Sequence, residues 1–200
     1  MWAFLRHPLT VAVIGVAITG VLVPYFARRW QERQKAWDVR VGLIADMSEA
    51  SSGLMARLKT VRRLAELADN PGASKEMRDE LHRARDSLNA ERHEFEIRDA
   101  VIGTKLQAYV RTPSPAIAER WTTLAEAMTE LVELEGSDAA HEAEHREKVL
   151  HLLRDLGPVP MDGQEWGDVY RAILYHKAAL IRTVMKEPMV FRTSWIPWGR

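Results

Sequence analysis

The feature that most constrains this chain is an uninterrupted uncharged run near its start. From Pro8 to Ala27 no side chain carries a formal charge, and most side chains are apolar. A helix of that length spans about 30 Å, the thickness of the hydrocarbon core of a bilayer. Only a helix satisfies its backbone polar groups inside a single membrane span. The run therefore predicts one transmembrane helix.

Charged residues begin directly after the run. Arg28, Arg29, Arg33 and Lys35 form a basic collar, whereas Arg6 is the only Lys or Arg before it. Lys and Arg accumulate on the cytoplasmic side of membrane spans, so we expect the N-terminus outside and the rest in the cytoplasm. Aromatic rings favour the headgroup region. The residues expected at the membrane interface are Tyr25, Arg28, Arg29, Trp30, Arg33 and Lys35.

A cleaved secretory signal is the competing interpretation of the same run. Signal cleavage requires small residues at positions −3 and −1, but Tyr25-Phe26-Ala27 places a ring at −3. The formal charges balance, with 28 basic and 28 acidic residues, so the composition does not indicate nucleic-acid binding. The collar predicts contact with lipid headgroups instead. Because Arg greatly outnumbers Lys, as in proteins from GC-rich bacterial genomes, we expect the membrane to be the bacterial inner membrane.

The remaining chain has the apolar periodicity of helices throughout. Breaks at Asn70-Pro71-Gly72, Thr112-Pro113, Gly136-Ser137 and Gly157-Pro158 divide it. The predicted helices run from the membrane to about residue 68, and over residues 74–111, 115–134, 138–156 and 162–187.

The predicted fold is all-α. Two helices of roughly 40 residues joined by a tight turn favour a long antiparallel hairpin, along which three shorter helices pack as a bundle. The predicted organisation is a transmembrane anchor at 1–27, a cytoplasmic helical bundle at 28–187 and an aromatic tail at 188–200.

One motif resembles a catalytic zinc site. His141-Glu142-Ala143-Glu144-His145 matches H-E-x-x-H, in which two histidines one helical turn apart share a zinc and the glutamate polarises its water. Lys148 stands where the longer form of the motif has a glycine, so His151 would point away on a continuing helix. We therefore predict no metal, no cofactor and no catalytic residue, and keep His141, Glu142 and His145 as the minority zinc-hydrolase candidate.

The spacing of Glu142 and His145 also fits the Glu-x-x-His element of di-iron bundles. Such a site needs a second pair, and Asp79-x-x-His82 is the only near match, with the wrong acid. The same residues are common on a solvated, acid-rich helix face, which is the interpretation we favour.

Self-association is predicted from two patterns. Ala12, Gly15 and Thr19 share one face of the span, where small residues let helices approach closely. Near-heptad spacing continues beyond the span and would suit a coiled-coil seam. Its members are Trp37, Val41, Ile44, Ser51, Met55 and Leu58. Because Ser51 is polar, the same stripe could equally pack on the chain's own second helix.

The tail has an excess of large apolar groups. Phe191, Trp195, Ile196 and Trp198 are expected to pack on the bundle, to enter the membrane interface or to anchor a partner. Together these patterns predict a membrane-tethered, non-enzymatic interaction or scaffold protein, homo-oligomeric, which presents a helical surface to a cytoplasmic partner. A regulatory or sensory subunit of a membrane complex is the alternative.

Overall fold

The structure is a computed structural model that describes residues 15–16, 18–110, 116–136, 139–158 and 166–187. The chain divides into two compact units, Met1–Val41 and Gly42–Arg200. The elements in chain order are η2 (Ile18–Leu22), α2 (Val23–Ala68), α3 (Lys75–Tyr109), α4 (Ala116–Gly136), α5 (Ala139–Leu156) and α6 (Trp166–Lys186). The all-helical fold predicted from the sequence is confirmed.

In the first unit the described residues are a π-helical turn, η2, and the first part of α2. None of the described residues before Ala36 is buried. Among the described residues, no helix combines the length and the hydropathy needed to cross a membrane. Much of the predicted span, residues 8–14 and 17, lies outside the described residues.

The helix boundaries in the second unit follow local chemistry. Helix α2 ends at Ala68, as predicted, and the turn after it is closed by the Ala73 N–H bonding to the Asn70 carbonyl. Helix α3 begins behind Ser74, whose hydroxyl oxygen accepts from the Met77 N–H at 3.3 Å. Helix α5 stops at Leu156 because Gly157 takes a φ of +130°, which favours glycine. The predicted starts at Pro115 and Asp162 lie outside the described residues.

Residues 42–68 of α2 and helix α3 form an antiparallel pair. Glu49 bonds to Arg98 and Asp46 to Lys105, so positions that rise along α2 meet positions that fall along α3. Gly53 of α2 lies opposite Glu91 of α3 in the same register, because a Cβ built on Gly53 would collide with the Glu91 carboxylate. The predicted antiparallel hairpin is thus present between residues 42–68 of α2 and helix α3.

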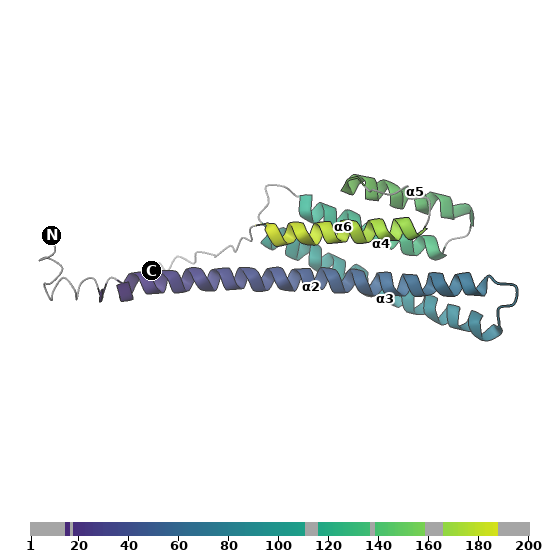
Figure 1. The fold of residues 1–200 in the computed structure, drawn as a ribbon, viewed down its shortest axis with the longest axis horizontal. Helices are drawn as coiled ribbons and strands as arrows, with labels where there is room; N and C mark the ends of the chain where they lie inside the picture. Colours follow the sequence, from purple (N-terminus) through teal and green to yellow (C-terminus); the bar gives the residue numbers. More distant parts are fainter. Residues whose placement is uncertain (1–14, 17, 111–115, 137–138, 159–165, 188–200) are drawn as a thin grey trace, which may run out of the picture. The chain divides into compact units, whose positions relative to one another are not determined.

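The other three helices complete the bundle. Figure 1 shows α4 and α6 between the outer helix α5 and the bundle part of α2. Helix α5 runs antiparallel to α4, because His145 and Lys148 meet Glu130 while Lys148 also approaches Glu126. Trp121, in the middle of this core, is fully buried together with Phe95 and Met128. Each helix therefore contributes the apolar stripe that its sequence predicts.

The structure changes the interpretation of the predicted seam. Ser51, Met55 and Leu58 are buried in the chain's own core, with 0–1% of each residue exposed. The Ser51 hydroxyl donates to the Met47 carbonyl at 2.6 Å, which satisfies it inside the helix. Of the two uses left open by the sequence, these three residues take the intramolecular one, whereas Trp37 and Val41 stay exposed.

Candidate functional site

An exposed aromatic face lies on the first part of α2. At 100° per residue, Val23, Phe26, Trp30 and Trp37 fall within an arc of about 60°. All four are more than half exposed, and Trp30 reaches 63%. Tyr25 stands beside this face, with its ring edge-to-face against Phe26 at 5.7 Å between centroids. Clustered exposed apolar side chains of this size are typical of surfaces that bind a protein, a membrane or a ligand.

An open hollow runs along this aromatic face. Its lining consists of Val23, Phe26, Ala27, Arg29, Trp30 and Arg33. The apolar members come first along the chain, and the two arginines flank Trp30. Over this stretch the lining changes from hydrocarbon to guanidinium within about 15 Å of helix. The hollow is therefore amphipathic along the helix axis.

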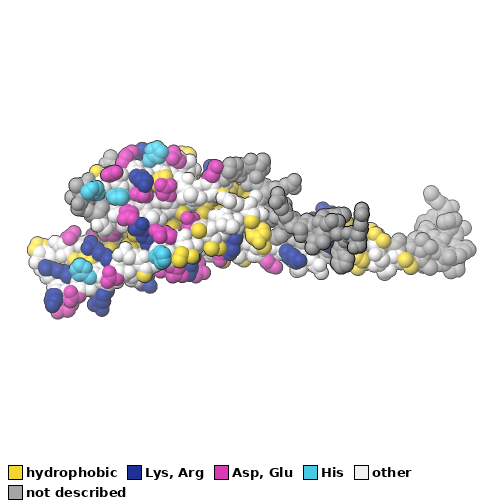
Figure 2. Space-filling model, turned by 180° about the vertical axis from the view of Figure 1, so that it is seen from behind, with side chains coloured by type: hydrophobic (Ala, Val, Ile, Leu, Met, Phe, Trp, Pro, Cys, Tyr) yellow, Lys and Arg dark blue, Asp and Glu magenta, His cyan; other side chains and the backbone are white. Residues whose placement is uncertain are grey.

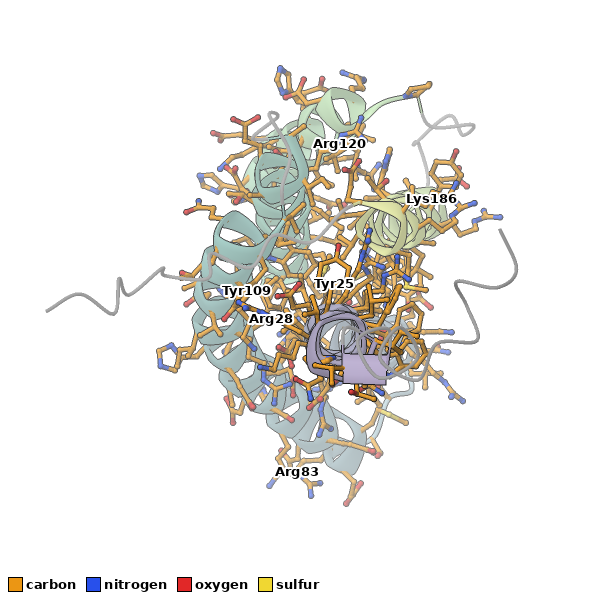
Figure 3. All side chains as sticks on the ribbon, turned by 90° about the vertical axis from the view of Figure 1, so that its left-hand side faces the viewer. Tyr25, Arg28, Arg83, Tyr109, Arg120 and Lys186 are labelled. Atoms are coloured by element: carbon orange, nitrogen blue, oxygen red, sulfur yellow. The ribbon has the colours of Figure 1, made fainter. Side chains whose placement is uncertain are left out.

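The collar arginines belong to two different faces. Arg29 and Arg33 line the hollow, and the Arg29 guanidinium donates to the Tyr25 hydroxyl at 3.5 Å. Arg28 and Lys35 are two helical turns apart and share nearly the same angular position around α2. That position lies roughly 130° around the helix from Arg29 and Arg33. Arg28 pairs there with Glu32 at 3.4 Å. Figure 3, which looks along α2, shows Tyr25 and Arg28 leaving its near end.

All six interface residues predicted from the sequence thus lie on consecutive turns of α2, but they point to different faces of the helix. Arg29, Trp30 and Arg33 line the hollow, whereas Arg28 and Lys35 do not. Val23, Phe26 and Trp37 complete the aromatic face, and their alignment with Trp30 was not predicted from the sequence. Helical periodicity could have found them, because the four apolar positions share one angle in the helical repeat.

The H-E-x-x-H residues lie on α5 and take part in polar contacts. His145 Nδ1 is 3.0 Å from Glu130 Oε2 on α4, and Glu142 lies 3.6 Å from Arg146. His151 lies beside Asp155 at 3.2 Å and is largely exposed. Within the described ranges, no three His, Asp or Glu side chains are grouped to hold a metal ion.

Glu130 is the centre of a polar contact that joins α4 to α5. Lys148 Nζ donates to its other oxygen at 2.5 Å. Burial alone would raise the pKa of Glu130, but the bonds from Lys148 and His145 outweigh it and lower the pKa. The ionised carboxylate is therefore a structural element of the bundle.

Glu135 on α4 and His176 on α6 are polar groups for which burial, not hydrogen bonding, sets the direction of the pKa shift. Burial, helped by the nearby Glu66 charge, raises the pKa of Glu135 although Arg62 lies 3.6 Å away. His176 is 7% exposed, its Nε2 has no hydrogen-bond partner among the described residues, and it borders a cavity of about 30 Å³ together with Arg120. Burial and the Arg120 charge lower the pKa of His176, which keeps the ring neutral.

A second surface lies between α2 and α3. Ile97 and Val101 are 56% and 48% exposed, one turn apart, and line a groove crossed by the Glu49–Arg98 and Asp46–Lys105 ion pairs. Figure 2 shows acidic and basic side chains interspersed over the face of the bundle seen there. The groove is thus apolar at its floor and charge-balanced at its rim.

The other predicted sites fall at or beyond the edge of the described residues. Gly15 has no heavy atom within 4 Å of a Cβ built on it, and the Thr19 hydroxyl donates to the Gly15 carbonyl at 2.8 Å. Ala12 and the tail residues Phe191, Trp195, Ile196 and Trp198 lie outside the described residues.

No family model, curated protein or solved structure matches this chain.

Proposed function

We propose that this protein is a membrane-tethered, non-enzymatic interaction protein. Residues 8–27 form a single span, the collar lies at the cytoplasmic headgroups, and the helical bundle is presented to a cytoplasmic protein. The span and the localisation rest on the sequence pattern. The span would anchor the helical bundle at the membrane surface.

The observation that carries the proposal is the exposed aromatic and basic face of α2. Val23, Phe26 and Trp30 expose more than half of their surface next to Arg29 and Arg33. Burying a side chain of this size is worth roughly 1.5–3 kcal/mol, so three of them strongly favour an apolar environment. A bilayer interface supplies hydrocarbon and headgroups in the same order as the lining of the hollow.

The bundle offers the Ile97–Val101 groove as its partner-facing surface. A contact of this kind would bury an apolar centre inside a polar rim, as protein interfaces do. We do not propose zinc hydrolysis, because His145 is engaged with Glu130. A regulatory or sensory subunit remains the second candidate, since α2 continues as one helix from Val23 to Ala68.

Membrane extraction tests the tether. The full chain should stay in the membrane pellet after an alkaline carbonate wash. Val16→Arg places a charge in the predicted span and should shift protein to the supernatant, because a charge at that depth is costly. Leu67→Arg is the matched control, since Leu67 is similarly apolar and 45% exposed but lies at the far end of α2. Wild-type protein released by carbonate would contradict the span.

Reporter fusions test the orientation. An enzyme reporter that works only in the cytoplasm should be active when fused after Arg200. A reporter that works only in the periplasm should be inactive at the same position, and activity there would contradict the proposed topology.

A further inference from the structure

The collar contains two pairs of cations that the structure separates. Arg29 and Arg33 line the hollow together with Trp30. Arg28 and Lys35 lie on the opposite flank, where Glu32 already pairs with Arg28 at 3.4 Å. In a nonspecific attraction to anionic surfaces, all four cations would contribute about equally to binding. At a specific site, only one of the two pairs would contact the ligand.

We propose that Arg29 and Arg33 bind the phosphate of an anionic phospholipid whose acyl chain lies against Val23, Phe26 and Ala27. This inference rests on the proposed membrane tether and adds to it a lipid class and a defined site. It assigns no headgroup contact to Arg28 or Lys35.

The geometry supports one headgroup shared by two arginines. Residues four apart are neighbours on a helix surface, so Arg29 and Arg33 lie one above the other on the hollow and are close enough to share one phosphate. A guanidinium group presents paired N–H donors that match a phosphate. The Arg29 guanidinium donates to the Tyr25 hydroxyl, which fixes that side chain beside the aromatic face.

The order of the lining residues identifies the ligand as a lipid. The apolar lining begins at Val23 and the last arginine is Arg33, about 15 Å along the helix. The apolar end belongs to the C-terminal turn of the predicted span, and the cationic end follows the span along the chain. Free phosphate would leave the Val23 and Phe26 surfaces in water, whereas a phospholipid covers both parts.

Charge disfavours a second copy of the chain as the occupant. In a two-fold symmetric contact the same patch meets itself, so each copy would bring Arg29 and Arg33 against their equivalents. Among the described residues, no acidic side chain lines the hollow to neutralise them. An anionic headgroup provides the opposite charge.

Lipid binding to the full-length protein in mild detergent tests the site. Native mass spectrometry would count bound phosphatidylglycerol and phosphatidylcholine with identical acyl chains. The wild type should retain phosphatidylglycerol preferentially. Arg29→Gln with Arg33→Gln should weaken that binding about 25-fold, at about fivefold for each charge near an anionic headgroup. Phosphatidylcholine binding should change less than twofold.

The matched control is Arg28→Gln with Lys35→Gln, which removes the same formal charge from the other flank. It should change phosphatidylglycerol binding less than threefold. Equal losses in the two double variants would overturn the site in favour of diffuse attraction. Displacement of the lipid by 10 mM inorganic phosphate, a concentration on the order of common buffers, would overturn the lipid assignment. A lipid-free dimer that Trp30→Ala converts to monomer would assign the hollow to a second copy.

The failure of this inference is distinguishable from failure of the tether. If the wild type resists carbonate but shows no phosphatidylglycerol preference, the span stands and the lipid site is wrong. If carbonate releases the wild type while the preference and its dependence on Arg29 and Arg33 persist, the lipid site stands and the span is wrong.

Discussion

The two parts of helix α2 carry similar apolar side chains and differ in what covers them. Eight residues between Leu43 and Val61 are buried in the bundle. Between Val23 and Trp37 the large apolar residues are about half exposed or more. The comparison teaches that an apolar stripe shows that a face favours burial, but not whether protein or lipid buries it.

The neighbouring charges differ as well. Along the buried part, Asp46 and Glu49 pair with cations of α3. Along the exposed part, Arg29 and Arg33 lie beside the aromatic residues and only Arg28 pairs with an acid among the described neighbours. The acidic residues of the buried part are therefore neutralised by cations of α3. For Arg29 and Arg33 of the exposed part, no acidic partner is found among the described residues.

The largest expected effect breaks the buried part. Leu54→Ala should lower the free energy of unfolding by about 3 kcal/mol, because Leu54 is fully buried and its loss leaves a cavity. Denaturant unfolding followed by far-UV circular dichroism measures this. Leu67→Ala, on the same helix but 45% exposed, should cost less than about 1 kcal/mol. Equal costs would contradict the assigned core.

Ser51→Leu separates a core position from a self-association seam. In the core, leucine adds volume to a filled site and should destabilise the fold by about 1–3 kcal/mol. In a coiled-coil seam, leucine would strengthen the contact instead. Thermal unfolding at two protein concentrations distinguishes them, and a melting temperature that rises with concentration would argue against the core position.

Glu130→Gln tests the polar contact that holds α5 on the core. The folded-state pKa of Glu130 lies below its ordinary value of 4.5, so its ionised form stabilises the fold above that pH. The variant should lose about 1 kcal/mol at pH 7. This loss should shrink as the pH falls through the folded-state pKa.

Glu126→Gln is the matched control for Glu130. Glu126 is half exposed and 3.9 Å from Lys148, so its loss should cost less than about 0.5 kcal/mol. Unfolding curves across pH 3–7 on both variants, roughly the range of carboxylate titration, provide the comparison. A loss for Glu130→Gln that is independent of pH would contradict the electrostatic origin.

Glu135→Gln should act in the opposite direction on the same helix. The pKa of Glu135 is raised above 4.5, so the unfolded chain ionises it more readily and stability falls as the pH rises from there to the folded-state pKa. Removing the charge should therefore stabilise the protein by roughly 0.5–1 kcal/mol at pH 7. The gain should vanish at low pH, and destabilisation at pH 7 would show that the Arg62 pair dominates.

The smallest expected effect on folding is at Trp30. Trp30→Ala should change the free energy of unfolding of the bundle by less than about 0.5 kcal/mol, because the ring is 63% exposed. The same variant should weaken phosphatidylglycerol retention, since the ring forms part of the hollow. A loss of stability comparable to that of Leu54→Ala would remove the contrast between the two parts of α2.

Much of the fold was predictable because its signals are local. The Asn70-Pro71-Gly72 break fixed the hairpin turn, and Ser74 supplied the cap of α3. The collar residues were also predicted, since a charge step along the chain needs no tertiary information. The division of the collar into two faces was within reach of helical periodicity, but the hollow that makes one face a site required the side-chain positions.

The sequence by itself determined the all-helical fold and the hairpin, because helix propensity, turn chemistry and apolar spacing act over a few residues. Only the tertiary structure decided that Ser51, Met55 and Leu58 belong to the core, that His145 engages Glu130 and that Glu135 is buried. Those outcomes depend on which distant helix lies alongside. Spacing along one helix defines a face, whereas burial and pKa depend on the groups that other helices bring to that face.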